Sequence, residues 1–368
     1  MKDNTINNLI LHTSLIKGIG PKTISILNKE YKELTTNFYN FNIRDFIERG
    51  IPKEKAELLY RELKNKDILY NELQLLNKHK SSFITPYDEE YPNQLKQQEN
   101  YPAVIYQQKN SVFNINNFTT LAVVSSRETN AYGKRVIYKL FEEIKGENIV
   151  IVSGGAVGGD TFIHEAALIN NFKTVSVIGA GLGNWYPQQN NLLFKNIINN
   201  GGIIMSHFPL DTKANKSTFP IRNSIIAGIS KATLVIQAGL KSGTLITANY
   251  ALEYGKEVGA VPGYIDDIVM IESNNLIKQG AHCITSGNDI LQMLNLKKTV
   301  TLDLKKKTYA DCTEEQKIIL SLCQEWLSLE EIKIHCNLTN DALYSELFLL
   351  MEKNYLMQDI LGNWKTIQ

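Results

Sequence analysis

The sequence has few cysteines, and they form no recognisable pattern. Its four cysteines are widely separated along 368 residues and include no Cys-x-x-Cys pair, so neither a disulfide framework nor a zinc site is indicated. No run of about 18 apolar residues occurs, which excludes a transmembrane helix of ordinary length. The first residues also lack the apolar segment of a secretion signal. We therefore expect a cytoplasmic protein that does not bind membranes.

The chain also lacks an excess of charge of either sign. Lys and Arg together number 39 and Asp and Glu 38, which leaves a formal net charge of +1. Any affinity for a polyanion such as nucleic acid must therefore come from local basic patches. At roughly 150 residues per domain, the length predicts two or three domains.

Two common nucleotide-binding motifs are missing. No loop matches Gly-x-Gly-x-x-Gly followed about 20 residues later by an acidic residue at a strand end. The P-loop pattern Gly-x-x-x-x-Gly-Lys-Ser/Thr does not occur either. These absences disfavour a dinucleotide cofactor and a P-loop nucleotide hydrolase, and we expect neither a cofactor nor a metal ion.

The spacing of apolar residues divides the chain into four parts. Residues 1–80 carry Leu, Ile, Lys and Glu at helical spacing, which predicts a small all-α domain. In residues 81–296 short apolar runs alternate with helical stretches, a pattern typical of an α/β fold with a doubly wound parallel sheet. A basic linker, 297–310, follows. Residues 311–368 show three capped helices and a hairpin, the order of a winged helix.

A short glycine turn stands out in the N-terminal part. Gly18-Ile19-Gly20, flanked by Lys17 and Lys22, is similar to the hairpin of a helix-hairpin-helix unit, whose backbone N–H groups bind phosphate. An ordinary glycine C-cap followed by a proline at the next helix start is the alternative.

Three glycine-rich loops follow predicted strands of the central part. In an open parallel sheet, ligands bind outside the carboxyl ends of the strands, where glycines and helix N-termini offer free N–H groups to anions. Three such loops favour an anionic ligand, although glycine after a strand also serves simple tight turning. The candidate residues are Ser153, Gly154 and Gly155 in one loop, Lys241, Ser242, Gly243 and Thr244 in another, and residues 179–183 in the third.

Basic residues and one aromatic lie beside these loops. Arg127 directly follows a predicted strand, and Lys216 precedes Phe219 by three residues. A cation beside an aromatic ring suits single-stranded nucleic acid, because the cation contacts phosphate while the ring stacks on an unpaired base. Two structural alternatives remain: a Phe219 ring that only covers the sheet edge, and an Arg222 that pairs with a carbonyl at a strand end.

The predicted recognition helix of residues 311–368 is poorly suited to DNA. It offers Tyr344, Glu346 and Glu352 with only Lys353, a poor match to a polyanion. We favour contact with a protein over sequence-specific reading of DNA.

The central part resembles the DprA/Smf family, DNA processing protein A, over nearly all of residues 83–296. The segments that carry the resemblance are SSRETNAYG (125–133), SGGAVGGD (153–160), GAGLGNWYPQQN (179–190), FPIRNSIIAGIS (219–230), SGTLITANYALEYGKEVGAVPG (242–263) and NNLIKQGA (274–281). The flanking parts fit the family's layout, which implies a SAM-like or helix-hairpin-helix-like domain before the sheet and a DML1-like winged helix after it.

The resemblance implies an extended Rossmann-like sheet for residues 81–296, and it implies a function as well. It implies a homodimer that binds incoming single-stranded DNA during natural transformation, protects it and helps to load the RecA recombinase on it, without enzymatic activity. It also implies a strand-binding role for Arg127, Lys216 and Phe219, and less directly for the Ser153–Gly155 turn and Arg222.

The chain departs from the family's usual pattern at several positions. The departures are Ser125 for a usual Gly, Asn130 for Ser or Thr, Gly159 for Ile, His207 and Gln237 for acids, Ser224 for Arg, and Ser273 for Gly. The missing arginine at 224 weakens the basic patch, and the missing acids at 207 and 237 partly offset that loss. Retuned DNA binding and neutral drift in the ion network behind the site both remain open.

Two other functions compete with strand binding. Lysine-decarboxylase-like phosphoribohydrolases hydrolyse nucleoside monophosphates with a glutamate after a glycine loop, but here the first acid after Ser242-Gly243-Thr244 is Glu253, more than two helical turns on. A winged-helix transcriptional regulator would rest on the C-terminal part alone.

Two further residue sets have mainly structural interpretations. The spacing of Asp160 and His164, one helical turn apart, favours a structural hydrogen bond over catalysis. Leu276, Ile277 and Ile284 are candidates for dimer contacts, unless they pack inside the domain.

Overall fold

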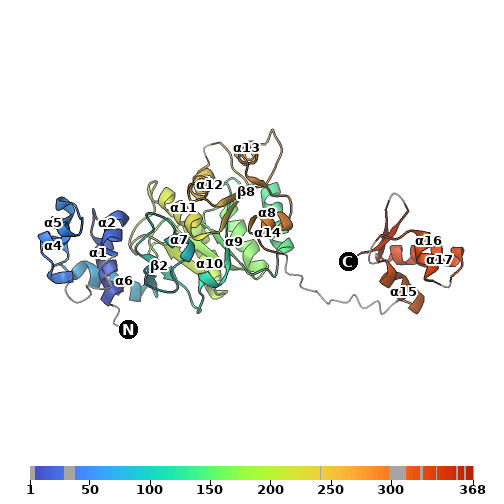
Figure 1. The fold of residues 1–368 in the computed structure, drawn as a ribbon, viewed down its shortest axis with the longest axis horizontal. Coiled ribbons are helices and arrows are strands. Elements are labelled where there is room, and N and C mark those ends of the chain that lie inside the picture. The colour runs from blue at the N-terminus through green and yellow to red at the C-terminus, as the bar shows by residue number, and fades with distance from the viewer. Residues whose placement is uncertain are drawn as a thin grey trace. The chain divides into compact units, whose positions relative to one another are not determined.

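The computed structural model forms two compact units that divide between Thr299 and Val300 (Figure 1). It describes residues 5–28, 38–240, 242–297, 312–323, 326–336, 338–353, 355–359 and 362–367. Most of the predicted linker, and also Lys241, therefore lie outside the described residues. Within the described ranges, no helix is both long enough and apolar enough to cross a membrane.

The N-terminal residues are helical, as their spacing predicts. The elements are α1 (Thr5–Leu15), α2 (Pro21–Asn28), η1 (Phe38–Asn40), α4 (Ile43–Glu48), α5 (Lys53–Glu62) and α6 (Asp67–Lys78). Gly18 has a φ of +100°, which a glycine adopts without strain, and reverses the chain between α1 and α2. Pro21 is the first residue of α2, the position where its missing N–H costs nothing.

A nine-stranded sheet forms the centre of the first unit, in the order β1-β2-β6-β5-β4-β3-β7-β8-β9. The strands are β1 (Ser82–Ile84), β2 (Ile105–Gln108), β3 (Thr119–Val124), β4 (Ile149–Ser153), β5 (Lys173–Val177), β6 (Ile203–Ser206), β7 (Ala232–Val235), β8 (Glu257–Ala260) and β9 (His282–Cys283). All pair in parallel except β1 with β2 and β2 with β6. The predicted α/β fold with an extended, mostly parallel Rossmann-like sheet is confirmed.

Helices cover both faces of the sheet. The connecting elements are α7 (Asn93–Lys96), α8 (Ala131–Glu143), α9 (Gly159–Ile169), α10 (Asn191–Asn199), α11 (Thr218–Ile229), α12 (Gly243–Glu253), α13 (Ile271–Lys278) and α14 (Gly287–Met293). Because side chains alternate along a strand, Leu121 and Val123 of β3 pack in one core with α8, α9 and α14. Ala122 and Val124 pack in the other core with α11, α12 and α13.

The N-terminal helices share a core with the sheet. Residues of α1, α5 and α6 cluster with Ile204 of β6 and with α10. Polar contacts add to this core: Asn7 Nδ2 donates to Asp88 Oδ1 at 2.9 Å, and the Leu210 N–H donates to Glu72 Oε1 at 2.9 Å. Burial raises the pKa of Glu72, while the Leu210 N–H lowers it.

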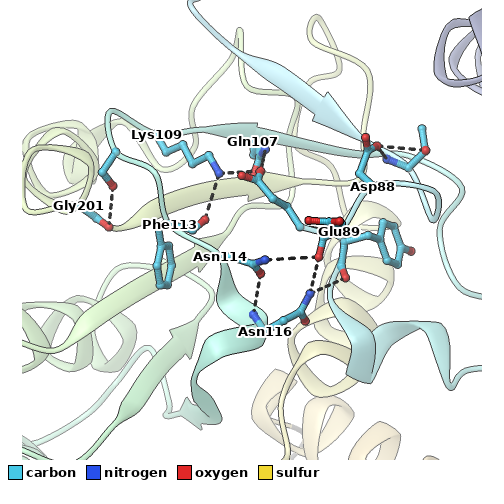
Figure 2. Close-up of polar contacts among 12 residues, drawn as sticks. Asp88, Glu89, Gln107, Lys109, Phe113, Asn114, Asn116 and Gly201 are labelled. Atoms are coloured by element: carbon cyan, nitrogen blue, oxygen red, sulfur yellow. Dashed lines mark hydrogen bonds and ion pairs between the residues drawn. The ribbon is translucent and has the colours of Figure 1, made fainter. Parts of the chain in front are cut away.

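The antiparallel edge of the sheet is fixed by a polar network (Figure 2). Lys109, which directly follows β2, contacts Glu90 Oε2 at 2.8 Å and donates to the Phe113 carbonyl at 3.1 Å. Asn116 Nδ2 donates to the Glu89 carbonyl at 2.8 Å. These contacts join the segment after β2 to Glu89 and Glu90, while the antiparallel pairing with β6 holds β2 in the sheet.

The second unit has its own core and the predicted element order. It contains α15 (Glu314–Leu322), α16 (Leu329–Ile334), α17 (Asn340–Glu352) and the antiparallel pair β10 (Leu356–Gln358) and β11 (Trp364–Thr366). Thr313 and Thr339 cap α15 and α17 through their side chains, as the sequence predicts. The winged-helix assignment and the four-part division of the chain stay predictions.

Candidate functional site

The site lies where the order of the strands reverses. β3 and β7 are neighbours in the sheet, but the chain runs outward from β3 through β4, β5 and β6 on one side and from β7 through β8 and β9 on the other. In open α/β sheets such a switch point leaves a crevice at the carboxyl ends of the strands. A cavity of about 640 Å³ occupies this place, between the residues after β3 and those after β7.

The cavity brings together six of the eleven residues that the sequence predicts. Arg127 comes from the loop after β3, Phe219 and Arg222 from α11, and Ser242, Gly243 and Thr244 from the start of α12. Beside the cavity lies a smaller hollow of about 70 Å³, which shares Arg127, Phe219 and Arg222 with it and adds Gly154.

An aromatic pair and one exposed arginine form the rim. The Arg127 guanidinium carbon lies 5.5 Å from the centre of the Phe219 ring. The Tyr186 ring lies 6.0 Å from Phe219 on another side, and Tyr186 is 47% exposed. Tyr186 lies in the segment 179–190, which carries part of the family resemblance, but the sequence predicts no role for it. The available signal was an aromatic residue soon after a glycine loop.

Arg222 is buried and bonds to backbone rather than facing solvent. It is 6% exposed, and its Nη1 donates to the Gly154 carbonyl and, at 2.9 Å, to the Val177 carbonyl. Burial lowers the pKa of Arg222, and nearby Asp160 raises it. A Cβ at position 154 would overlap Arg222 Nη1, so this turn requires glycine. Pairing with strand-end carbonyls is the structural alternative that the sequence left open.

The other residues of the first glycine loop face inward. Ser153 is fully buried and its hydroxyl donates to the Val123 carbonyl at 2.8 Å. Gly155 has a φ of +67°, and its carbonyl accepts from Asn190 Nδ2 at 2.9 Å. These hydrogen bonds fix the backbone on both sides of Gly154, which lines the hollow. Lys216 is exposed and lines neither the cavity nor the hollow, and Lys241 lies outside the described residues.

Helix starts surround the cavity and give it positive potential. α9, α11 and α12 begin at Gly159, Thr218 and Gly243, and the first N–H groups of a helix have no partner within it. Two acids also line the cavity, exposed Glu128 and buried Asp160. Burial raises the pKa of Asp160, while Arg222 lowers it.

His164 has the structural hydrogen bond that its position predicts. It is fully buried on α9, with Nδ1 2.8 Å from Thr174 Oγ1. Burial lowers its pKa to about 3, so the ring is neutral. In the described part of the chain, no group of three or more His, Cys, Asp or Glu side chains could hold a metal ion.

Four of the departures from the family's usual residues form two contacting pairs, and Ser125 of one pair lines the cavity. A Cβ on Gly159 would overlap the Ser125 side chain, so the larger residue at 125 goes with the smaller one at 159. Gln237 accepts from the Asn130 N–H at 3.1 Å and donates to Asn130 Oδ1 at 2.9 Å. The two pairs join the segment after β3 to the start of α9 and to the segment after β7.

The candidates for dimer contacts pack inside the first unit. Leu276 is 5% and Ile284 1% exposed, and Ile277 is partly buried against the same core as Leu276. This is the alternative that the sequence left open: Leu276 and Ile284 offer no surface to a partner, and Ile277 remains partly exposed.

The fold and the site define a class: an α/β protein with a crevice, rimmed by an arginine and aromatic rings, at the switch point of a Rossmann-like sheet. Residues 82–295 match the family of the DNA recombination-mediator protein A. The chain belongs to this family, which confirms the resemblance seen in its motifs.

Several relatives extend the match beyond the sheet. Protein Smf of Synechocystis is 33% identical over 289 residues, which cover 76% of this chain and 71% of that protein. The DNA processing protein DprA of Bacillus subtilis is 36% identical over 68% of this chain and 82% of its own length.

Two solved structures are similar. The crystal structure of DNA processing protein A from Streptococcus pneumoniae has a TM-score of 0.68 at 31% identity and covers 79% of this chain and 98% of its own. The protein from Helicobacter pylori, whose structure concerns its single-stranded DNA binding mode, has a TM-score of 0.52 at 25% identity and covers 58% of this chain and 95% of its own.

Proposed function

We propose that the crevice binds single-stranded DNA along its sugar-phosphate backbone and performs no bond-breaking step. The observation that carries this proposal is the exposed Arg127 guanidinium 5.5 Å from the Phe219 ring, at a cavity surrounded by helix N-termini. Proteins that bind single strands combine cations along the backbone with aromatic rings on which bases stack. The binding mode of the Helicobacter pylori relative supports the same function.

The predicted residues take different parts in this proposal. Arg127 contacts phosphate, Phe219 stacks on a base, and the turn of Ser242, Gly243 and Thr244 binds a further phosphate. The Gly243 N–H is the donor there, because the Ser242 N–H donates to the Gly239 carbonyl and the Thr244 N–H to the Ser242 hydroxyl. Exposed Lys216 extends the basic track outside the cavity, and Lys241 adds a charge beside the α12 loop. Buried Arg222 and Ser153, with Gly154 and Gly155, hold the wall in shape.

Family membership supports the wider role. As a recombination mediator, the protein would act in the cytoplasm as a homodimer, protect incoming strands during natural transformation and help to load the RecA recombinase. The second unit fits protein contact better than DNA contact, because α17 exposes Tyr344 (50%) and Phe348 (57%) near Glu352.

The salt dependence of binding to oligo-dT tests the proposal. Each phosphate contact releases bound counterions, so losing one contact lowers the slope of log K against log salt by about 0.7 for a single strand. We expect Arg127→Ala and Lys216→Ala each to weaken binding and flatten this slope. Lys195→Ala, which removes an exposed charge on α10 away from the cavity, is the control and leaves both unchanged. An unaltered slope in both test variants would refute the assignment.

The two competing functions have their own tests. Glu253 ends α12 and does not line the cavity, so the cavity lacks the glutamate after the glycine loop with which the phosphoribohydrolases act. Turnover of AMP would nevertheless establish that activity. Tighter binding to mixed-sequence duplex than to single strands at physiological salt would instead favour a transcriptional regulator.

A further inference from the structure

Part of the lining of the cavity between β3 and β7 is aliphatic and open to solvent. Leu240 follows β7, Ile246 lies on α12 and Ile268 follows β8, and all three line the cavity. Their exposed fractions are 68%, 37% and 69%. Exposed aliphatic side chains are ordinary when they are scattered, but a group of them from separate segments in one cavity marks a binding surface. We call these three residues the aliphatic patch.

The loops that carry the aliphatic patch are held against each other. A Cβ on Gly239 would lie 3.1 Å from the Ile268 carbonyl, so Leu240 and Ile268 come from segments in direct contact. The Ala238 N–H donates to Ser273 Oγ at 3.0 Å, which ties the loop after β7 to α13. Ser273 is one of the departures from the family's usual residues, and the usual glycine would have no hydroxyl for this bond. The chain's own sequence therefore fixes the loop behind Leu240.

The two sides of the cavity differ in chemistry. The residues after β3 are polar and charged and include Arg127 and Glu128, whereas the residues after β7 and β8 supply the aliphatic patch. A sugar-phosphate backbone would lose hydration against aliphatic carbons and gain no partner there. A nucleobase has apolar faces that gain free energy when they leave water. The cavity volume of about 640 Å³ also lies within the range of roughly 300–1,000 Å³ of pockets that enclose small organic ligands.

We propose that the aliphatic patch contacts the bases of the bound strand inside the cavity, while Arg127 contacts the backbone at the rim. The inference rests on the proposed function and adds which part of the strand enters the cavity. The side chains of the patch have no hydrogen-bonding group, so the contact is with base faces and tolerates any base. In a duplex the bases are stacked on their neighbours and cannot present their faces, so this contact favours unpaired DNA.

Two strands of equal length separate base contacts from backbone contacts. One is oligo-dT, and the other carries abasic residues throughout and keeps the same phosphates. Fluorescence anisotropy measures the affinity of the full-length protein for both strands at low salt. We expect Leu240→Ser and Ile268→Ser each to weaken binding of oligo-dT about four- to tenfold, as for the loss of one or two buried methylene groups. Both variants leave binding of the abasic strand unchanged.

Three further variants complete the experiment. Leu192→Ser is the matched control, because Leu192 on α10 is 71% exposed and does not line the cavity; it leaves both affinities unchanged. Ser273→Ala removes the hydroxyl that fixes the loop after β7, and we expect it to weaken binding of oligo-dT and not of the abasic strand. Arg127→Ala weakens binding of both strands, because both carry phosphates.

The outcomes separate this inference from the proposed function. If Leu240→Ser and Ile268→Ser bind oligo-dT like wild type, or lose equal affinity for both strands, the base contact is overturned. A changed mass in solution with unaltered oligo-dT affinity would instead make the patch an interface between two copies of the chain, which also overturns it. In each case a weaker Arg127→Ala leaves the first site standing. If Arg127→Ala and Lys216→Ala leave both the affinity and the salt slope unchanged, the proposed function itself fails.

Discussion

At the scale of single residues, the neutral, buried His164 couples the stability of the first unit to pH. Its pKa is about 3 in the folded chain instead of the ordinary 6.5. Between these values the unfolded chain binds a proton that the folded chain does not, so stability falls as the pH falls from about 6.5 toward 3, by up to about 1.4 kcal/mol per pH unit.

Replacing the histidine tests this coupling. We expect His164→Gln to have a flatter decline of unfolding free energy between pH 6.5 and pH 4 than wild type, because glutamine does not titrate. Urea unfolding of both proteins at several pH values measures the difference. If the unfolding free energy of both proteins declines equally below pH 6.5, His164 does not contribute to the acid sensitivity of the first unit.

A second residue-scale prediction concerns glycine 154. A methyl group there overlaps the buried guanidinium of Arg222, which two backbone carbonyls hold in place. We expect Gly154→Ala to lower the unfolding free energy by about 1–3 kcal/mol, as overpacking does. Gly243→Ala is the control, because a Cβ there meets nothing within 4 Å. Equal stability of the two variants in denaturant titrations would contradict the steric argument.

At the scale of elements, the start of α8 depends on a residue pair from two distant segments. Asn130 caps the helix by accepting from the Gly133 N–H at 3.1 Å, and the Gln237 side chain fixes the cap by donating to the same Asn130 oxygen. Gln237 is fully buried, so its hydrogen bonds cannot be replaced by water.

This arrangement predicts a rescue. Gln237→Glu places a carboxylate oxygen against Asn130 Oδ1, and we expect it to cost about 1–3 kcal/mol of stability. Adding Asn130→Thr supplies a hydroxyl that donates to the carboxylate and still caps the helix, so the double variant regains most of the loss. Unfolding free energies of the two single variants and the double variant form the test; strictly additive losses would rule out the coupling.

Elements also show how far a sequence pattern reaches. The apolar runs predict β3 to β8 and their helices because each strand is buried on both faces. β1, β2 and β9 were not predicted. β1 and β9 have three and two residues, too few for a periodic signal, and β2 (IYQQ) ends in two glutamines, so it makes no apolar run. In the structure, β1 is identified by its pairing with β2, β9 by its pairing with β8, and β2 by its antiparallel pairing with β6.

At the scale of the whole molecule, the two units have separate cores. Leu347 is fully buried among residues of the second unit only. We expect calorimetry to show two transitions, and Leu347→Ala to lower only the second unit's stability, by about 2–5 kcal/mol. Leu349→Ala on the same helix, where the side chain is 45% exposed, leaves both transitions in place. One shared transition that moves with Leu347→Ala would show that the units unfold together.

The sequence by itself determined the fold class, the family and the loops that carry the site. These follow from local signals: apolar periodicity, glycines after strands and motifs that are read in chain order. Arg127, Phe219 and the Ser242–Thr244 turn were predicted in this way and meet at one cavity.

Only the tertiary structure decided which of those residues face the cavity. Ser153 belongs to one of the predicted loops, yet it is fully buried and does not line the cavity. Arg222 lines the cavity, but its Nη1 bonds to backbone carbonyls. Tyr186 contacts Phe219, which is distant in the chain. Gln108 and Trp185 each have a buried polar atom for which the described residues supply no partner, and no local pattern predicts this. The physical reason is that burial and hydrogen-bond partners depend on packing between distant segments, which local spacing does not contain.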